Sequence, residues 1–187
     1  RSYSVGNFDK IDLAGAYDVT VHTGSPVSVK AHGGENVLER LKVEVRNGTL
    51  VIEPKERGWS WGNHGKVKLD VTVPSLSGAQ LSGAGDINID QVKGDRFEGG
   101  VSGAGDLMVD RAEVGELKLG IRGAGSATVR AGTARSVALD VAGAGDVDTK
   151  GVTSETAPVS IAGPGGARAN ASKTASVSIM GAGDVEM

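Results

Sequence analysis

The stretch Ser82-Gly83-Ala84-Gly85-Asp86 is repeated along the second half of the chain at a fixed interval. Related stretches start at positions 102, 122 and 142, so the starts are evenly spaced. A degenerate copy starts at Ala162, and a clean copy starts at Met180, slightly short of a full period. A fixed period of about 20 residues is typical of solenoids, in which each repeat buries its apolar side against its neighbours. It is too short for a propeller blade.

Apolar and polar residues alternate on both sides of each motif, which is the pattern of strands with one buried face. Before the third motif the apolar positions are Leu117, Leu119 and Ile121. The same parity recurs in the other repeats, with Thr149 as a polar exception. We therefore predict that each motif is flanked by two short strands whose apolar side chains point inward. The motif glycines share this parity, so we expect them to face inward, where a Cβ would collide with the next coil.

Two strands and two turns in every repeat predict an all-β protein of the β-solenoid class. We expect a right-handed parallel β-helix with coils of about 20 residues and a less regular N-terminal part. A β-meander barrel is the competing fold, but it would place tight Asn-Gly or Asp-Gly turns between its strands. The repeats contain neither dipeptide, and Phe97 is the only aromatic residue after position 61. Both observations favour a narrow interior built from stacked aliphatic layers.

Composition narrows the classes of partner and cofactor. The 187 residues include 30 glycines, but no Gly-X-Y triplet repeat runs through the chain, which excludes collagen. The 20 basic and 23 acidic residues give a net charge of -3 without a basic, aromatic-rich surface, so we expect no nucleic-acid partner. No apolar run approaches the ~18 residues of a membrane span. Cysteine is absent, which excludes disulfides and thiol catalysis, and we expect no cofactor.

Residues 1–81 are less regular than the rest. Ala14-Gly15-Ala16-Tyr17-Asp18 looks like a worn copy of the motif, so the solenoid is expected to begin there. A hairpin is predicted over residues 43–52 around Asn47-Gly48, a strand over 67–73, and one or two helical turns over 34–41. We interpret residues 1–187 as a single domain, with an irregular N-terminal β region over 1–81 and a six-copy repeat solenoid over 82–187.

The order of these segments resembles one known family. The resemblance is carried by Phe8 to Val21, by Asn47-Gly48-Thr49-Leu50, and by a Val-Thr-Val-Pro-Ser-Leu stretch at 71–76 that leads into the serial motifs. Together they are similar to the putative auto-transporter adhesin head GIN domain family, formerly a domain of unknown function. The resemblance covers nearly the whole chain. It implies an exported bacterial β-helical protein, periplasmic or at the cell surface, with an adhesive role, no catalytic residues, and an export signal already removed.

The last residue of each motif is expected to form an outward column. This column is interrupted at Ser126 and Gly166, and its acidic members are Asp86, Asp106, Asp146 and Asp184. Carboxylates about 5 Å apart repel each other unless cations intervene, so one interpretation is a ladder of calcium ligands. In the other, each aspartate accepts backbone N–H groups in its own turn and stays solvated. The two interruptions favour the second interpretation.

A glycine-rich segment over residues 57–65 contains the two tryptophans of the chain. Trp59 and Trp61 could stack on sugar rings, with Asn63 and His64 supplying hydrogen bonds, because exposed indoles bury a large area at low entropic cost. In the competing interpretation the rings fold back and cap an edge of the solenoid. These four residues are the candidate ligand-binding site.

We therefore interpret the chain as a non-enzymatic, adhesin-like surface or periplasmic protein with a glycan or cell-surface partner. The alternative is a structural or self-assembling envelope module without a small ligand, which would form homo-oligomers. Its flat packing face would be a column of motif alanines, namely Ala84, Ala104, Ala124, Ala144 and Ala182. A polysaccharide lyase or hydrolase ranks third, because clustered acids and bases on one face are missing.

Overall fold

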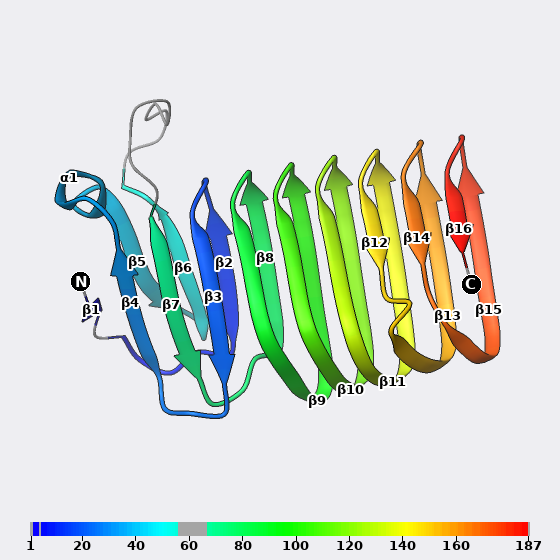
Figure 1. Ribbon diagram of the computed structural model, residues 1–187, viewed down its shortest axis with the longest axis horizontal. Coiled ribbons are helices and arrows are strands. Elements are labelled where there is room, and N and C mark those ends of the chain that lie inside the picture. Colours follow the sequence, from blue (N-terminus) through cyan, green and yellow to red (C-terminus); the bar gives the residue numbers. More distant parts are fainter. Residues whose placement is uncertain (1, 4, 56–66, 187) are drawn as a thin grey trace.

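Three long parallel strands form the centre of the molecule. The computed structural model describes residues 2–3, 5–55 and 67–186, and its central strands are β9 (Asp86–Gly103), β10 (Asp106–Gly123) and β11 (Ser126–Gly143). Their register is constant, with Leu107 paired to Ile87 on one side and to Ala127 on the other. Each strand curves from one face of the molecule to the other, and a short turn leads to the next coil (Figure 1). The predicted β-solenoid is confirmed, although the two strands expected in each of these repeats are continuous.

Toward the C-terminus the coils keep their stacking but contain shorter strands. One face continues through β12 (Asp146–Asp148), β14 (Gly166–Arg168) and β16 (Asp184–Glu186), and the other through β13 (Val152–Ala162) and β15 (Ala171–Met180). All of these strands pair in parallel. Val177 and Ile179 of β15 have the predicted inward parity, but their side chains are 45% and 41% exposed.

The N-terminal region contains two further coils whose order in space differs from their order in the sequence. β2 (Lys10–Ala14) and β3 (Asp18–Thr23) form one coil, and β6 (Thr49–Pro54) and β7 (Lys68–Val73) form a coil outside it. The next coil begins with β8 (Gly78–Gly83), which pairs with β2 and β9. Gly15 lies against Gly83, so the worn motif copy belongs to the solenoid, as predicted. Part of residues 1–81 therefore continues the regular parallel stack.

Antiparallel strands end the parallel stacking on the N-terminal side. β4 (Ser28–His32) pairs with β7, β5 (Leu41–Arg46) pairs with β6, and β1 (Ser2–Tyr3) pairs with β4. The predicted hairpin is confirmed, with positive φ angles at Asn47 (51°) and Gly48 (77°). The predicted helical turn is α1 (Glu35–Leu38). Within the described ranges, no helix has the length and hydropathy needed to cross a membrane.

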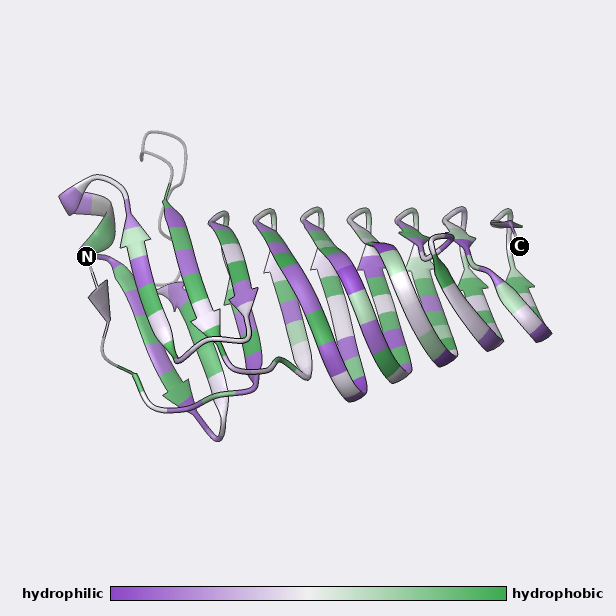
Figure 2. Cartoon of the chain, turned by 60° about the horizontal axis from the view of Figure 1, so that its bottom comes forward, coloured by the Kyte–Doolittle hydropathy of each residue, from purple (hydrophilic) through white to green (hydrophobic). Residues whose placement is uncertain are grey.

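The interior is a single stack of mainly aliphatic side chains. Apolar and polar positions alternate along the strands, as Figure 2 shows, and Leu117, Leu119 and Ile121 are each 1% exposed. Phe97 is fully buried. Thr149 is also buried, and its hydroxyl donates a hydrogen bond to the Arg168 carbonyl oxygen at 3.0 Å. The predicted inward parity of the apolar residues is therefore confirmed.

The two glycines of each motif have different roles, so the prediction that both face inward is wrong for the first. Gly103 and Gly123 are exposed and have φ angles of 113° and 110°, because the chain reverses direction there. The second glycine, such as Gly125, is buried. Both approach the previous coil closely. A Cβ on Gly123 would lie 2.8 Å from the Gly103 carbonyl oxygen, and a Cβ on Gly125 would clash with the Gly105 carbonyl oxygen. The predicted collision between coils is thus confirmed at both positions.

We predict that Gly123→Ala destabilises the fold by about 1–3 kcal/mol, because it adds a clash with backbone to a φ that disfavours side chains. Gly120→Ala, earlier in the same coil, is the matched control. A Cβ there has the Asp140 carbonyl oxygen as its nearest contact, at 3.9 Å, and should cost nothing. Chemical denaturation of both variants measures the difference. Equal stability of the two variants would contradict the close approach of the coils.

Candidate functional site

The two outward faces of the solenoid carry different side chains. We call the outward positions of β9–β11 that lie before the bend, together with β12, β14 and β16, the charged face. Its side chains form ion pairs across the coils: Arg168 Nε lies 3.3 Å from a Glu186 oxygen, and Lys150 Nζ lies 2.9 Å from the other. The side-chain hydrogen bond and charge of Lys150, with the charge of Arg168, lower the pKa of Glu186. Charges at the C-terminal end of this face therefore compensate one another.

The predicted aspartate column lies on the charged face and is longer than expected. In the register of adjacent strands, Asp86 lies beside Asp106 and Ser126 lies beside Asp146. Gly166 and Asp184 continue the same column. The column also contains Asp18, which pairs with Asp86 although the two are far apart in the sequence. Asp18 was not predicted as a member of the column, although it ends the worn motif copy and therefore occupies the same motif position.

Stacking places three carboxylates on consecutive coils. Burial and the neighbouring charges of Asp106 and Asp18 raise the pKa of Asp86, against an opposing backbone hydrogen bond from Asp106. The sequence predicted that Asp86 would accept N–H groups of its own turn. The donor named here, Asp106, lies on the next coil instead. The Ser126 hydroxyl donates to Asp106 at 2.6 Å, so the interruption of the column relieves repulsion.

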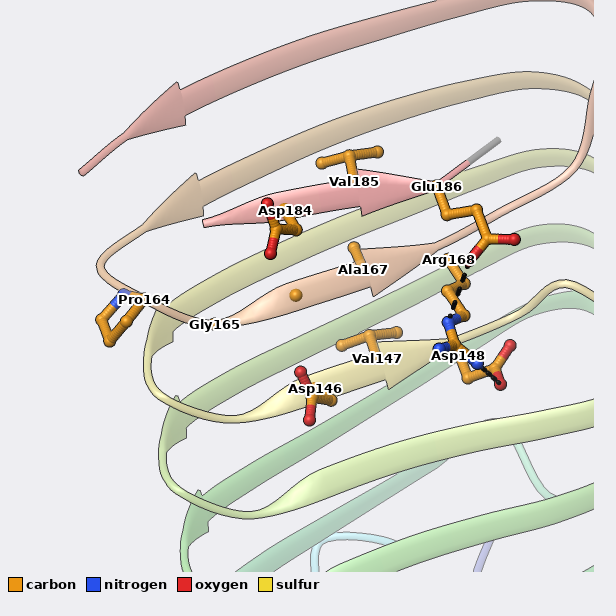
Figure 3. A pocket seen from close by; sticks show the side chains of 11 residues that line it. Asp146, Val147, Asp148, Pro164, Gly165, Ala167, Arg168, Asp184, Val185 and Glu186 are labelled. Carbon is orange, nitrogen blue, oxygen red and sulfur yellow. Dashed lines mark ion pairs between the residues drawn. The ribbon is translucent and has the colours of Figure 1, made fainter. Parts of the chain in front are cut away.

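A hollow of about 410 Å³ interrupts the same column near the C-terminus. It opens where Gly166 has no side chain, and Asp146 and Asp184 flank it from the coils on either side (Figure 3). Arg168 beside it forms ion pairs with Asp148 and Glu186. Among the residues that the structure describes, no three His, Cys, Asp or Glu side chains are grouped as metal ligands.

The opposite side carries smaller and less charged outward residues, and we call it the grooved face. It consists of outward side chains in β2, β8, the later parts of β9–β11, β13 and β15, within residues 10–14, 78–82, 98–102, 118–122, 138–142, 158–162 and 176–180. This face was not predicted. The available signal was the occurrence of glycine at outward strand positions such as Gly100 and Gly120.

Four hollows lie on the grooved face and its bend, with volumes of about 510, 390, 300 and 210 Å³. The first two share Gln80 and Glu98, and the last three share Lys118. They therefore adjoin one another in a series that crosses the coils from Asp12 in β2 to Ser176 in β15, and we call this series the depression. Burial and the charge of Glu53 raise the pKa of Asp12 at its N-terminal end, while Arg46 lowers it.

The residues predicted as the ligand-binding site, Trp59, Trp61, Asn63 and His64, lie outside the described residues. In the sequence these four residues follow β6 and precede β7. The predicted alanine column is exposed at the turns, as expected, and comprises Ala84, Ala104, Ala124, Ala144 and Ala182.

We predict that Asp86→Asn stabilises the protein at pH 7 by about 0.5 kcal/mol, because it removes like-charge repulsion between paired strands. The raised pKa means that the folded state binds the Asp86 proton more tightly than the unfolded chain. The advantage of the neutral side chain should therefore vanish below pH 3.8, the ordinary value, and grow as pH rises through the raised pKa. Thermal melts at several pH values test this.

Asp146→Asn is the control, because its column neighbours Ser126 and Gly166 carry no charge. If the two substitutions change stability equally at pH 7, repulsion within the column is not the cause.

Solved structures of several bacterial proteins share this fold. A putative adhesin from Bacteroides fragilis NCTC 9343 has a TM-score of 0.80 and 22% identity, with 100% of this chain and 94% of that chain covered. A structure described as a putative lipid binding protein from Parabacteroides distasonis ATCC 8503 has a TM-score of 0.72 and 20% identity, covering 100% and 95%. A putative adhesin from Parabacteroides merdae ATCC 43184 has a TM-score of 0.69 and 18% identity, with 100% of this chain and 94% of that chain covered.

No curated protein matches the chain. The sequence profile of one family, however, matches residues 7–187, which include every coil of the solenoid and the aspartate column. The family resemblance predicted from the order of the sequence segments is therefore confirmed. The chain belongs to the family described as putative auto-transporter adhesin, head GIN domain.

Proposed function

We propose that this protein is an exported, non-enzymatic adhesin that binds carbohydrate along its grooved face. The observation that carries the proposal is the depression, a series of adjoining hollows that crosses successive coils instead of one deep pocket. A depression of this shape suits an extended polymer, which can contact several coils at once. The adhesin description of the family supports a location at the cell surface or in the periplasm.

The distribution of titratable groups supports binding over catalysis. Perturbed acids and bases gather at catalytic sites. Here the described groups with shifted pKa values are scattered: Asp12 in the depression, Asp86 and Glu186 on the charged face, and Tyr17 in the core, where burial raises its pKa. The residues that line the four hollows include no histidine. A hydrolase or lyase would need paired acid and base groups in reach of one bond.

We retain the tryptophan segment as a second contribution to the same function. Trp59 and Trp61 would stack on sugar rings, and Asn63 and His64 would add hydrogen bonds. β6 and β7, which this segment connects, stack beside β2 and β3, and β2 lines the N-terminal hollow.

We predict that the wild-type protein binds one or more oligosaccharides on a glycan array, and that the double variant W59A/W61A loses at least part of this binding. The melting temperature should stay unchanged if the rings bind ligand. If the rings instead cap a solenoid edge, their removal should cost roughly 2 kcal/mol or more per ring and lower the melting temperature. A large drop in melting temperature without any change in glycan binding would count against the sugar-binding role.

A second candidate function, self-assembly of an envelope module, is favoured by one observation. The last described coil exposes Val177, Ile179 and Met180 on β15, at 45%, 41% and 73%, and β15 pairs only with β13. An exposed apolar edge strand is a template for pairing with another chain.

We predict that, if this edge mediates assembly, wild-type protein forms dimers or larger species in multi-angle light scattering and Ile179→Lys is monomeric. Ser178→Lys is the control, because Ser178 has the outward parity on the same strand. A monomeric wild-type protein at high micromolar concentration would exclude assembly through this edge.

A further inference from the structure

Gly120 is a glycine that the fold does not require. It lies within β10, and its φ is not among the positive values that occur at the turn glycines. A Cβ on Gly120 would have open space above it, with the Asp140 carbonyl oxygen nearest at 3.9 Å. By contrast, the turn glycine Gly123 has a positive φ, and a Cβ there would clash with the Gly103 carbonyl oxygen. A glycine in a strand interior costs stability and often marks a place where a ligand approaches the backbone.

The residues around Gly120 form a shallow trough, the hollow of about 390 Å³. Gly100 lies beside Gly120 in the adjacent strand, and the Gln80 side chain lies across Gly100. The floor over Gly120 is bare peptide, whose N–H and C=O groups point along the sheet toward the strands on either side. Polar groups of a bound molecule must therefore be met by the side chains at the rim.

Four charged side chains at this rim have no partner within the described part of the chain. Lys118 and Arg122 flank Gly120 on its own strand, while Glu98 and Asp140 lie on the adjacent strands. None of the four forms an ion pair or a side-chain hydrogen bond there. On the same strands at the bend, Arg96 and Glu116 do pair, at 3.0 Å. The rim thus offers two side chains that donate hydrogen bonds, Lys118 and Arg122, and two that accept them, Glu98 and Asp140.

We propose that the trough binds one ring of an uncharged polysaccharide, which lies flat on Gly120. Lys118 and Arg122 donate hydrogen bonds to ring hydroxyl oxygens, and Glu98 and Asp140 accept hydroxyl protons. A hydroxyl both donates and accepts, so it matches a rim of both kinds. The two cations and two anions sum to zero, which favours an uncharged chain over an acidic one, because an acidic chain would face Glu98 and Asp140. The assignment rests on the proposed carbohydrate-binding function.

The test is the substitution Gly120→Thr, with Asn88→Thr as its control on the charged face. The threonine fills the trough, but a β-branched side chain suits an open strand position, so the melting temperature should be unchanged or higher. Binding to mannan, dextran, laminarin and arabinoxylan is measured by biolayer interferometry, with polygalacturonate as the acidic probe. We expect at least one uncharged probe to bind the wild type and the control, and to bind Gly120→Thr at least tenfold more weakly.

The rim is tested separately with Lys118→Ala and Asp140→Ala, each of which should weaken binding by about tenfold through a lost charged hydrogen bond. Affinity for the uncharged probe should not change between low and high salt. If an uncharged probe binds Gly120→Thr as it binds the wild type, the trough assignment fails and the proposed function stands. If only polygalacturonate binds, and salt abolishes it, the uncharged class is wrong. If no probe binds the wild type, carbohydrate binding itself fails.

Discussion

The close approach of each turn to the previous coil is the constraint on which the rest of the structure depends. A Cβ on Gly103 would lie 2.7 Å from the Gly83 carbonyl oxygen, and the same contact recurs at Gly123 and Gly143. Only glycine tolerates both this distance and the positive φ of the turn. Because each turn must lie directly against the one before, the central coils have equal lengths, and β9, β10 and β11 pair without a shift of register.

Fixed register means that every outward position belongs to a column, so the choice of one residue affects two neighbours about 4.8 Å away. On the charged face this produces both repulsion, as between Asp86 and Asp106, and compensation, as between Arg168 and Glu186. On the grooved face the same rule places Gly100 beside Gly120, so that the Gln80 side chain lies across Gly100 while the space over Gly120 stays open. The solenoid therefore turns small local changes of sequence into surface features that extend across several coils.

The period of the motif and the parity of residues such as Leu117 were sufficient to predict the solenoid and its core, because both follow from local geometry repeated in sequence. Asp18 was not recognised as a member of the aspartate column, and β6 and β7 were not recognised as a coil of the stack, since their spatial neighbours are distant in the chain. The orientation of Gly123 was wrong because a turn breaks the period-two alternation. The grooved face was missed for a different reason: its signal is the absence of side chains, which hydropathy patterns do not register.

The direction of the depression has a consequence for the kind of ligand that fits. It crosses the strands, so a bound chain would run along the long axis of the solenoid and meet a new coil about every 4.8 Å. This spacing is similar to the length of one sugar residue in an extended polysaccharide, whereas a peptide strand bound across a closed sheet face would find its backbone groups unpaired. Since the coils are rigidly paired on both sides, the ligand would pay most of the ordering entropy. Weak contacts at each coil would then add along the chain, which is how a shallow surface achieves useful affinity.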